Sequence, residues 1–242
     1  MSDKAVVESL AWDSAWLGYP VGRVGAQSPR QVAEAVADSQ ARGLRLLYLV
    51  IDSAAEAAIA GAQAAGAWLA DVRLTYHKPL PEAILSDQAP QASGIEYQLM
   101  TEPSAALDQL ALQSSQYSRF RRDARISVQA CNLLYAEWLR QALAGGGAWV
   151  AVRKGTTLGL LTLGTRNAHA SIELLAVSAE ARHQGLGQGL VQVAQREASR
   201  QGQALLQVVT QETNRAAQLF YEHCGFQLAR REHVFHLWQQ PE

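Results

Sequence analysis

The sequence has few cysteines and no segment suited to a metal site or a membrane span. Only Cys131 and Cys224 occur among 242 residues, and we expect both to be free thiols in a cytoplasmic protein. No group of His, Cys, Asp or Glu has the spacing of metal ligands, so we expect no bound metal. No apolar run approaches the roughly 18 residues of a membrane helix, and we expect no secretory signal, because residues 1–10 lack an apolar core.

An excess of charge of one sign is also lacking. The formal net charge is −1 and charged residues make up 18% of the chain, which does not suggest a nucleic-acid surface or a polybasic membrane patch. We therefore expect a globular protein that binds no nucleic acid and does not insert into membranes. A chain of 242 residues can form one large or two small domains with real hydrophobic cores.

The most informative segment is a glycine-containing loop, Arg182-His183-Gln184-Gly185-Leu186-Gly187. It follows an apolar run at residues 172–177 and opens a segment, residues 186–200, with the pattern of a helix. Glycines let a backbone approach a ligand closely, and the amides and dipole of a helix start favour a diphosphate. The segment lacks the Lys-Ser/Thr of a P-loop and the third glycine of a Rossmann fingerprint, so it fits neither.

A second motif follows about 30 residues later. It has the order N-x-x-A-x-x-x-Y-x-x-x-G-F, filled by Asn214, Ala217, Tyr221, Gly225 and Phe226. Together the two motifs resemble those of the GCN5-related N-acetyltransferase (GNAT) family, over about residues 95–238. The resemblance implies an enzyme that uses acetyl-coenzyme A (acetyl-CoA), with the cofactor diphosphate at the glycine loop and the thioester near the tyrosine.

Periodicity and turn residues predict an α/β fold with a mixed sheet. In residues 1–80, Ser28 should cap a helix that runs to about residue 42, followed by a strand at 44–51, a helix at 53–65 and a strand at 67–78. The second half should contain strands at 95–100, 148–153, 157–164, 168–177, 204–210 and 226–238, and helices at 102–113, 128–143, 186–200 and 214–223. This order is typical of the GNAT fold. We therefore expect a GNAT domain at residues 95–242, a proline-containing linker at 81–94, and an N-terminal partial, degenerate GNAT-like half at 1–80.

An internal repeat supports the idea of a partial first copy. A shift of 159 residues aligns nine identical residues without a gap, from Gly43 with Gly202 to His77 with His236. Alanines stand in the first copy where Asn214 and Tyr221 stand in the second, and no glycine loop precedes them. We expect one cofactor site, in the second half. The alternative is a similarity of composition between two alanine-rich segments.

The resemblance assigns roles to residues of both motifs. Tyr221 is expected to act as the general acid for the leaving thiolate, since a phenol carries its proton at neutral pH. An amide near Leu175 or Ala176 is the expected oxyanion donor, and on a helix Asn214, Ala217 and Tyr221 share one face. The expected cofactor-binding residues are Leu175, Ala176, Val177, Arg182, His183, Gln184, Gly185, Leu186, Gly187, Gln188, Asn214, Ala217 and Tyr221.

The general base is less clearly marked. Glu173 lies two residues before Leu175, which predicts that both side chains lie on the same face of the strand. His169, His183, Asp71 or a chain of water molecules are the alternatives. No cysteine is placed for a covalent intermediate, so we expect direct transfer in a ternary complex.

The acceptor side is indicated by Ser118-Arg119-Phe120-Arg121, which with Arg122 and Arg125 forms a cationic cluster. Arginine forks suit a diphosphate and an aromatic ring can pack on a sugar, so we expect Arg119, Phe120 and Arg121 to bind substrate. With the aromatic segment at residues 10–18, the cluster resembles the TDP-fucosamine acetyltransferase family, which implies a nucleotide-linked amino sugar as acceptor. A solvated basic loop paired with Asp123 is the alternative at this segment.

Other functions stay open at this point. The acceptor could be another small-molecule amine, such as an amino acid, a polyamine or an antibiotic. A non-catalytic acyl-CoA-binding module is a further alternative, which the presence of Asn214 and Tyr221 disfavours. A homodimer is also left open.

Overall fold

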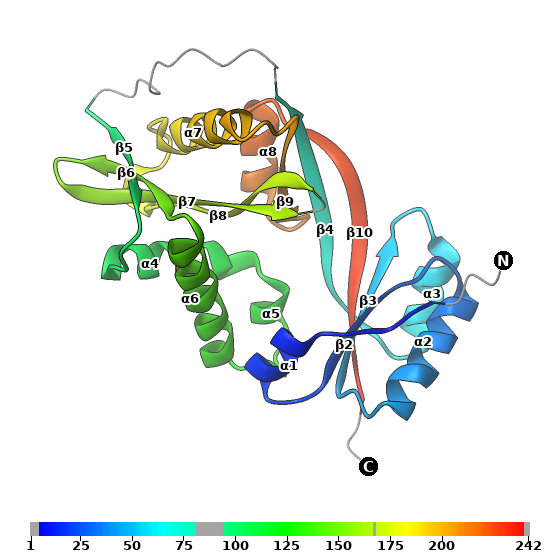
Figure 1. The fold of residues 1–242 in the computed structure, drawn as a ribbon. Helices are drawn as coiled ribbons and strands as arrows, with labels where there is room; N and C mark the ends of the chain where they lie inside the picture. Colours follow the sequence, from blue (N-terminus) through cyan, green and yellow to red (C-terminus); the bar gives the residue numbers. More distant parts are fainter. Residues whose placement is uncertain (1–4, 81–93, 167, 240–242) are drawn as a thin grey trace.

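A computed structural model of the chain describes residues 5–80, 94–166 and 168–239. In this part of the chain, eight α-helices flank a mixed sheet of ten strands (Figure 1). This is the α/β architecture with a mixed sheet that the sequence predicted. The linker expected at residues 81–94 lies almost entirely outside the described residues.

Both halves of the chain contribute to the sheet. The first half forms β1 (Glu8–Ser9), α1 (Ala11–Leu17), β2 (Val21–Gly25), α2 (Pro29–Ala41), β3 (Leu46–Asp52), α3 (Glu56–Ala64) and β4 (Trp68–Pro79). The second half forms β5 (Glu96–Met100), α4 (Ala105–Ser114), α5 (Arg119–Arg122), α6 (Val128–Gly145), β6 (Ala148–Arg153), β7 (Thr156–Arg166), β8 (His169–Val177), α7 (Leu186–Arg200), β9 (Leu205–Gln211), α8 (Arg215–His223) and β10 (Gln227–Trp238). The predicted elements are found within a few residues of their expected bounds, whereas β1, α1, β2 and the short helix α5 were not predicted.

The strand order shows that neither half forms its part of the sheet alone. The order is β1-β2-β3-β10-β4-β9-β8-β7-β6-β5. The last strand, β10, thus lies between β3 and β4 of the first half, and β4 lies between β10 and β9 of the second half. Figure 1 shows β4 and β10 as long neighbouring strands that join the two parts of the molecule. The backbone hydrogen bonds of β4 and β10 therefore hold the two halves together.

The repeat seen in the sequence is present in the structure. The bounds of β9, α8 and β10 are each 159 residues higher than those of β3, α3 and β4. The ladders follow the same relation, since Glu232 pairs with Asp52 on β3 and Arg73 pairs with Gln211 on β9. Arg73 and Glu232, which are equivalent positions of the two copies, also pair with each other. A local two-fold axis therefore passes between these two residues.

A salt bridge lies on this local axis. Nε and Nη2 of Arg73 donate to Oε2 of Glu232 over 3.0 and 2.7 Å. The side chain of Glu232 is 2% exposed and also contacts Arg230 at 2.9 Å. Burial lowers the pKa of Arg73, while the neighbouring Glu232 acts in the opposite direction. The two copies are therefore joined at their centre by the salt bridge between Arg73 and Glu232, in which each charge stabilises the other.

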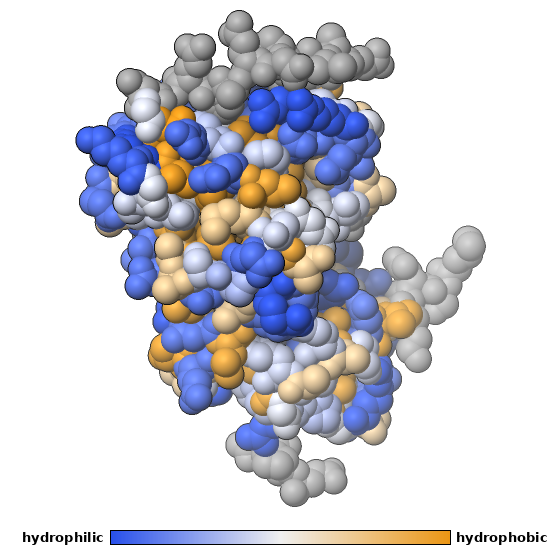
Figure 2. Space-filling model, turned by 60° about the vertical axis from the view of Figure 1, so that its left-hand side comes forward, coloured by the Kyte–Doolittle hydropathy of each residue, from blue (hydrophilic) through white to orange (hydrophobic). Residues whose placement is uncertain are grey.

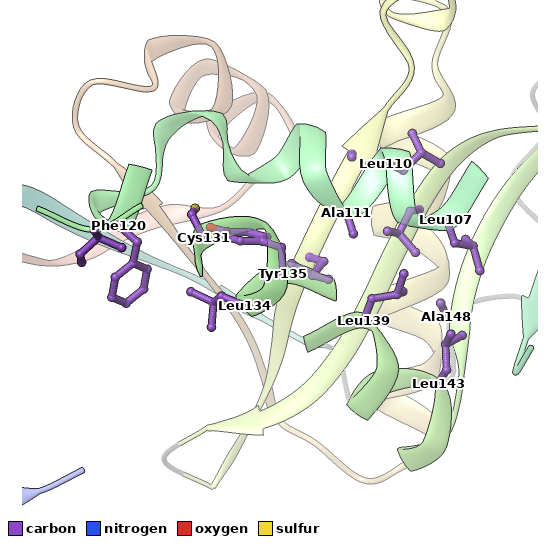
Figure 3. Close-up of a cluster of buried hydrophobic side chains, with 14 of the residues drawn as sticks. Leu107, Leu110, Ala111, Phe120, Cys131, Leu134, Tyr135, Leu139, Leu143 and Ala148 are labelled. Atoms are coloured by element: carbon purple, nitrogen blue, oxygen red, sulfur yellow. The ribbon is translucent and has the colours of Figure 1, made fainter. Parts of the chain in front are cut away.

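Three hydrophobic clusters fill the space between helices and sheet. Leu47 and Leu49 of β3 pack with α2 and α3, whereas Leu46 and Tyr48 pack on the opposite face of the same strand. A second cluster lies between α7, α8 and the strands β4 and β7–β9. In the third, side chains of α4 and α6 point toward each other and toward the sheet (Figure 3). Each fully buried leucine contributes about 1.5–3 kcal/mol.

The outer surface is mixed in polarity. The face seen in Figure 2 carries hydrophilic residues interrupted by smaller hydrophobic patches. The exposed large apolar side chains include Val128 and Leu133 of α6, Leu219 of α8 and Leu228 of β10. In the described part of the chain, no helix combines the length and apolarity needed to cross a membrane.

We predict that Glu232→Ala destabilises the protein by about 3 kcal/mol, because it leaves the half-buried Arg73 without its partner. Urea denaturation followed by circular dichroism would measure the loss. Glu137→Ala is the control, since Glu137 forms an exposed pair with Arg140 of the same helix and its removal should cost much less. Equal losses in the two variants would contradict a central role for the Arg73–Glu232 pair.

Candidate functional site

The parallel strands β8 and β9 separate along most of their length. Only residues 170–172 of β8 pair with residues 206–208 of β9. Beyond this point β8 remains paired with β7, and β9 remains paired with β4. The facing edges of residues 173–177 and 209–211 are therefore not paired with each other, and their backbone N–H and C=O groups can bind an extended ligand.

The glycine loop lies at the open end of this gap. Gly185 is the N-cap of α7 and has a φ of 83°, and His183 also has a positive φ of 60°. No side chain caps the start of α7, so its first amides remain available to an anion. Nε of Arg182 donates to the carbonyl oxygen of Val177 at 3.2 Å, which ties the loop to the end of β8. The local structure is that expected of an anion site.

One basic residue beside the loop was missed by the sequence analysis. Nη1 of Arg153 donates to Oε1 of Gln184 at 2.7 Å, and Nε2 of Gln184 donates to the carbonyl oxygen of Glu180 at 3.0 Å. Arg153 comes from β6, and only the strand register brings it to the loop. No local sequence signal could have identified it.

The other predicted residues of the loop region differ in exposure. Leu186 is 1% exposed and anchors α7 in the hydrophobic cluster beneath it. A Cβ on Gly187 would lie 3.1 Å from Cε2 of Phe220, so the start of α7 and helix α8 are in close contact. The predicted residues along β8 and at the loop are otherwise exposed (Arg182, His183, Gln184), intermediate (Leu175, Val177, Gly185, Gly187, Gln188) or buried (Ala176).

Asn214 forms the N-cap of α8. Its Oδ1 accepts a hydrogen bond from the backbone N–H of Ala217 at 3.2 Å. Two predicted cofactor residues are thus in contact with each other, and the oxygen of the Asn214 amide has a structural role. Its Nδ2 group remains as the donor that this side chain can offer to a ligand.

Tyr221 is buried on the α8 side of the sheet. It is 6% exposed, and its ring lies 6.3 Å from that of Tyr76, 5.3 Å from that of Phe220 and 5.7 Å from that of Phe226. Burial, with a smaller effect of Cys224, raises the pKa of Tyr221 well above its usual value. The phenol therefore keeps its proton at neutral pH.

The structure corrects the predicted orientation of Glu173. The β7–β8 ladder has an irregularity at this residue, because Leu163 pairs with Ile172 and Thr162 pairs with Leu174. Ile172 and Leu175 both pack on the α7 side although they are three residues apart. The Glu173 carboxylate instead lies 2.5 Å from where a Cβ of Gly164 would be, on the opposite face. The prediction that Glu173 shares a face with Leu175 is therefore wrong, because this β-bulge shifts the alternation.

Most of the predicted cationic cluster already has partners. Phe120 is 4% exposed in the core, so its ring has almost no open face. Arg121 donates to Oγ of Ser115 and to Oδ1 of Asn132, each at 2.7 Å. Arg125 pairs with Asp123 at 2.9 Å, as the alternative interpretation of this segment expected.

Arg119 and Asp71 differ from these neighbours. The Arg119 guanidinium stacks over the rings of Phe120 and Tyr48, at 4.2 and 4.8 Å, and its Nε is buried without a hydrogen-bond partner. Asp71 is 5% exposed, and its Oδ1 is buried without a partner. Burial raises the pKa of Asp71 to about 6, although Arg119, Arg122 and Arg73 act to lower it. Asp71 was one of the alternatives for the general base.

The cysteines and the possible metal ligands of the described residues form no disulfide and no metal site. Cys131 and Cys224 are free thiols. Among residues 5–80, 94–166 and 168–239, no group of three or more His, Cys, Asp or Glu side chains could hold a metal ion.

We predict that Asp71→Asn stabilises the protein at pH 7 by about 3 kcal/mol and has little effect near pH 4. The pKa of Asp71 is raised, so between about pH 4 and 6 the folded state retains a proton that the unfolded chain releases, and stability falls as the pH rises. Urea unfolding at several pH values would measure the effect.

Asp123→Asn is the matched control for this experiment. Burial alone would raise the pKa of Asp123, but hydrogen bonds from His236, Arg125 and Trp238 hold it well below its usual range. This variant should therefore lose stability at pH 7, and the loss should diminish as the pH falls through the native pKa. A stability difference for Asp71→Asn that does not change with pH would contradict our account.

The comparisons with known proteins agree with this geometry. Residues 111–226 match the model of the acetyltransferase (GNAT) family. No curated protein matches the sequence. The family match spans the gap between β8 and β9, the glycine loop and helix α8.

Several solved structures have a similar fold. A GCN5-related N-acetyltransferase from Sphaerobacter thermophilus has a TM-score of 0.61 at 14% identity, with 97% of this chain and 76% of that chain covered. One from Kribbella flavida has a TM-score of 0.59 at 15% identity, with 99% and 90% covered. A tandem GNAT protein from the clavulanic acid biosynthesis pathway has a TM-score of 0.54 at 18% identity, with 93% and 77% covered. The chain therefore shares the fold of these proteins, and its residues 111–226 are similar to the GNAT acetyltransferase family.

Proposed function

We propose that the protein is an acetyl-CoA-dependent N-acetyltransferase that acts on a small-molecule amine by direct transfer in a ternary complex. The observation that carries this proposal is the gap between β8 and β9, which pair over only three residues. A gap of this kind offers backbone groups to an extended ligand, with an uncapped helix start at its open end.

The residues present fit coenzyme A. The open amides of α7, the left-handed Gly185 and the nearby Arg153 suit a diphosphate. The unpaired edge of Leu175, Ala176 and Val177 suits an amide-containing arm. The cofactor supplies the acetyl group as a reactive thioester.

The two proposed catalytic side chains lie on opposite faces of the sheet. Tyr221 packs on the α8 side, and the Glu173 carboxylate lies on the other side, at the point where β8 leaves β9. The transferred acetyl group would therefore have to lie in the gap between them. Glu173 takes a proton from the amine, and Tyr221 donates a proton to the sulfur.

In this reaction a bond forms between the amine nitrogen and the acetyl carbon, and the carbon–sulfur bond breaks. A backbone amide at Leu175 or Ala176 would donate a hydrogen bond to the carbonyl oxygen as its negative charge increases. The products are an amide and the free thiol of coenzyme A. No covalent enzyme intermediate is needed.

The acceptor lies on the Glu173 face of the sheet, where α5 also packs. We propose a nucleotide-linked amino sugar as the candidate acceptor, because Arg119 offers a stacked guanidinium with an unsatisfied donor. Phe120 and Arg121 would act indirectly, since the ring supports Arg119 and the Arg121 guanidinium is held by Ser115 and Asn132. Amino acids, polyamines and antibiotics remain alternative acceptors.

We predict that Gly185→Ala lowers the affinity for coenzyme A about tenfold or more, as measured by calorimetry. Alanine disfavours the left-handed backbone that presents the loop amides, by about 1–2 kcal/mol. Gly202→Ala is the control, because Gly202 has a φ of 71°, has no atom within 4 Å of its added Cβ, and follows the far end of α7. Equal affinities in the two variants would show that the loop does not bind the cofactor.

We predict that Tyr221→Phe lowers kcat about 100-fold and leaves the affinity for acetyl-CoA nearly unchanged, because it removes only the proposed acid. Thiol release from acetyl-CoA in the presence of nucleotide-linked amino sugars and simple amines would measure turnover. Tyr76→Phe is the control, since Tyr76 neighbours Tyr221 but donates to Glu222 at 3.1 Å.

Three results would change the proposal. Turnover by Tyr221→Phe at the rate of the unaltered protein would remove this residue from the mechanism. Cofactor binding without thiol release from any amine would favour the non-catalytic acyl-CoA-binding module. A preference for simple amines over nucleotide-linked sugars would reject the proposed acceptor while retaining the enzyme class.

A further inference from the structure

Two oppositely charged side chains with buried, unpartnered polar atoms lie near the start of helix α5. Asp71 of β4 is 5% exposed with an unpartnered Oδ1, and Arg119 of α5 has a buried, unpartnered Nε. The two groups are close enough for Arg119 to affect the pKa of Asp71, yet they form no salt bridge. Asp13 of α1 is also influenced by Arg119 and forms no salt bridge with it. Groups of this kind are costly to bury unless a partner satisfies them.

Neighbouring charged groups on the same face are satisfied by protein partners. Asp123 accepts hydrogen bonds from His236 at 2.7 Å and from Trp238 at 2.8 Å, and it pairs with Arg125. Arg73 is held by Glu232. Two further buried atoms without a partner, the hydroxyl oxygen of Tyr48 and Nε2 of His236, lie beside Arg119, so the unsatisfied groups gather around this guanidinium.

This space lies on the acceptor side of the proposed reaction. Leu74 and Tyr76 of β4 pack on the α7 side, so Asp71 and Arg73, which alternate with them, lie on the other face. Arg73 pairs with Gln211 at the end of β9, beyond the point where β8 and β9 separate. The Glu173 carboxylate lies on this same face. A molecule with its amine at the gap would extend over Arg73 toward Asp71 and Arg119.

We propose that Asp71 and Arg119, one from each half of the chain, form a paired recognition site for the acceptor. Arg119 binds an anionic group of the acceptor, a carboxylate or a phosphate, and Asp71 accepts a hydrogen bond from a hydroxyl or N–H group of the same molecule. This rests on the proposed function and narrows its substrate class to amines that carry an anion. It also gives the first half a part in the site, since that half contributes Asp71.

The Arg119 stack supports an anion as the ligand. Its guanidinium carbon lies 4.8 Å from the ring centre of Tyr48 and 4.2 Å from that of Phe120, and these contacts restrict the side chain, so less side-chain entropy is lost when it binds. A planar fork of this kind matches the oxygens of a carboxylate or phosphate. A polyamine fits less well, because Arg119 would repel its second ammonium group.

The test is a calorimetric titration of the CoA-saturated protein with three amines. O-Phosphoethanolamine carries a phosphate, β-alanine carries a carboxylate, and ethanolamine carries neither. We expect at least one of the two anionic amines to bind about 10- to 100-fold more tightly than ethanolamine, as charge-assisted hydrogen bonds allow. The stronger of the two identifies the anion.

Variants assign this preference to the two residues. Arg119→Gln should abolish the preference for the anionic amine, and Asp71→Asn should weaken its binding while retaining the preference. Arg140→Gln is the control and should retain it, because Arg140 is an exposed arginine of α6 that pairs with Glu137. Circular dichroism would confirm that all three variants are folded.

Each outcome separates the two proposals. Equal binding of the three amines, no detectable binding of any of them, or a preference that survives in Arg119→Gln would overturn the paired site. Tight binding of an anionic amine without thiol release from acetyl-CoA would leave the site in place and overturn the transferase proposal.

Discussion

The exchange of the long strands β4 and β10 is the constraint on which the rest of the structure depends. Because β10 lies between β3 and β4, the backbone hydrogen bonds of the first half are completed only by the last residues of the chain. The same exchange places β4 against β9, next to the gap that the proposed cofactor requires. The site of the second half is thus built on a strand of the first half.

The two copies differ in the features that the proposed cofactor site requires. In the first copy, β2 and β3 pair over all five residues of β2, so no gap opens between the parallel strands. Helix α2 is capped by Ser28, whose Oγ accepts from the N–H of Gln31, and Oε1 of Gln31 accepts from the N–H of Gln27. These side chains occupy the helix start that remains open in α7. In the first copy, the paired strand edges and the capped helix start therefore leave no open backbone groups at the positions where the second copy could bind a diphosphate.

The sequence predicted the structural features that depend on residues close together in the chain. Periodicity and capping residues gave the helices and strands, and for α7 (Leu186–Arg200) they gave the observed bounds. It could not give the strand order, because the pairing of β10 with β3 joins residues about 180 positions apart. The β-bulge at Glu173 and the meeting of Arg153 with Gln184 depend on the register of distant strands in the same way. Local secondary structure was therefore predicted better than the arrangement of residues that are distant in the sequence.

The contrast between Asp123 and Asp71 shows how a polar group with a structural role differs from one that awaits a ligand. Asp123 is surrounded by donors, its pKa is lowered, and its charge stabilises the fold. Asp71 is as deeply buried, but its pKa is raised and one oxygen has no partner, so its charge opposes folding at neutral pH. The folded protein would be more stable with an apolar side chain at this position. A carboxylate that lowers stability, near a guanidinium whose Nε has no partner, is explained most simply by a function, because binding sites commonly sacrifice stability in this way.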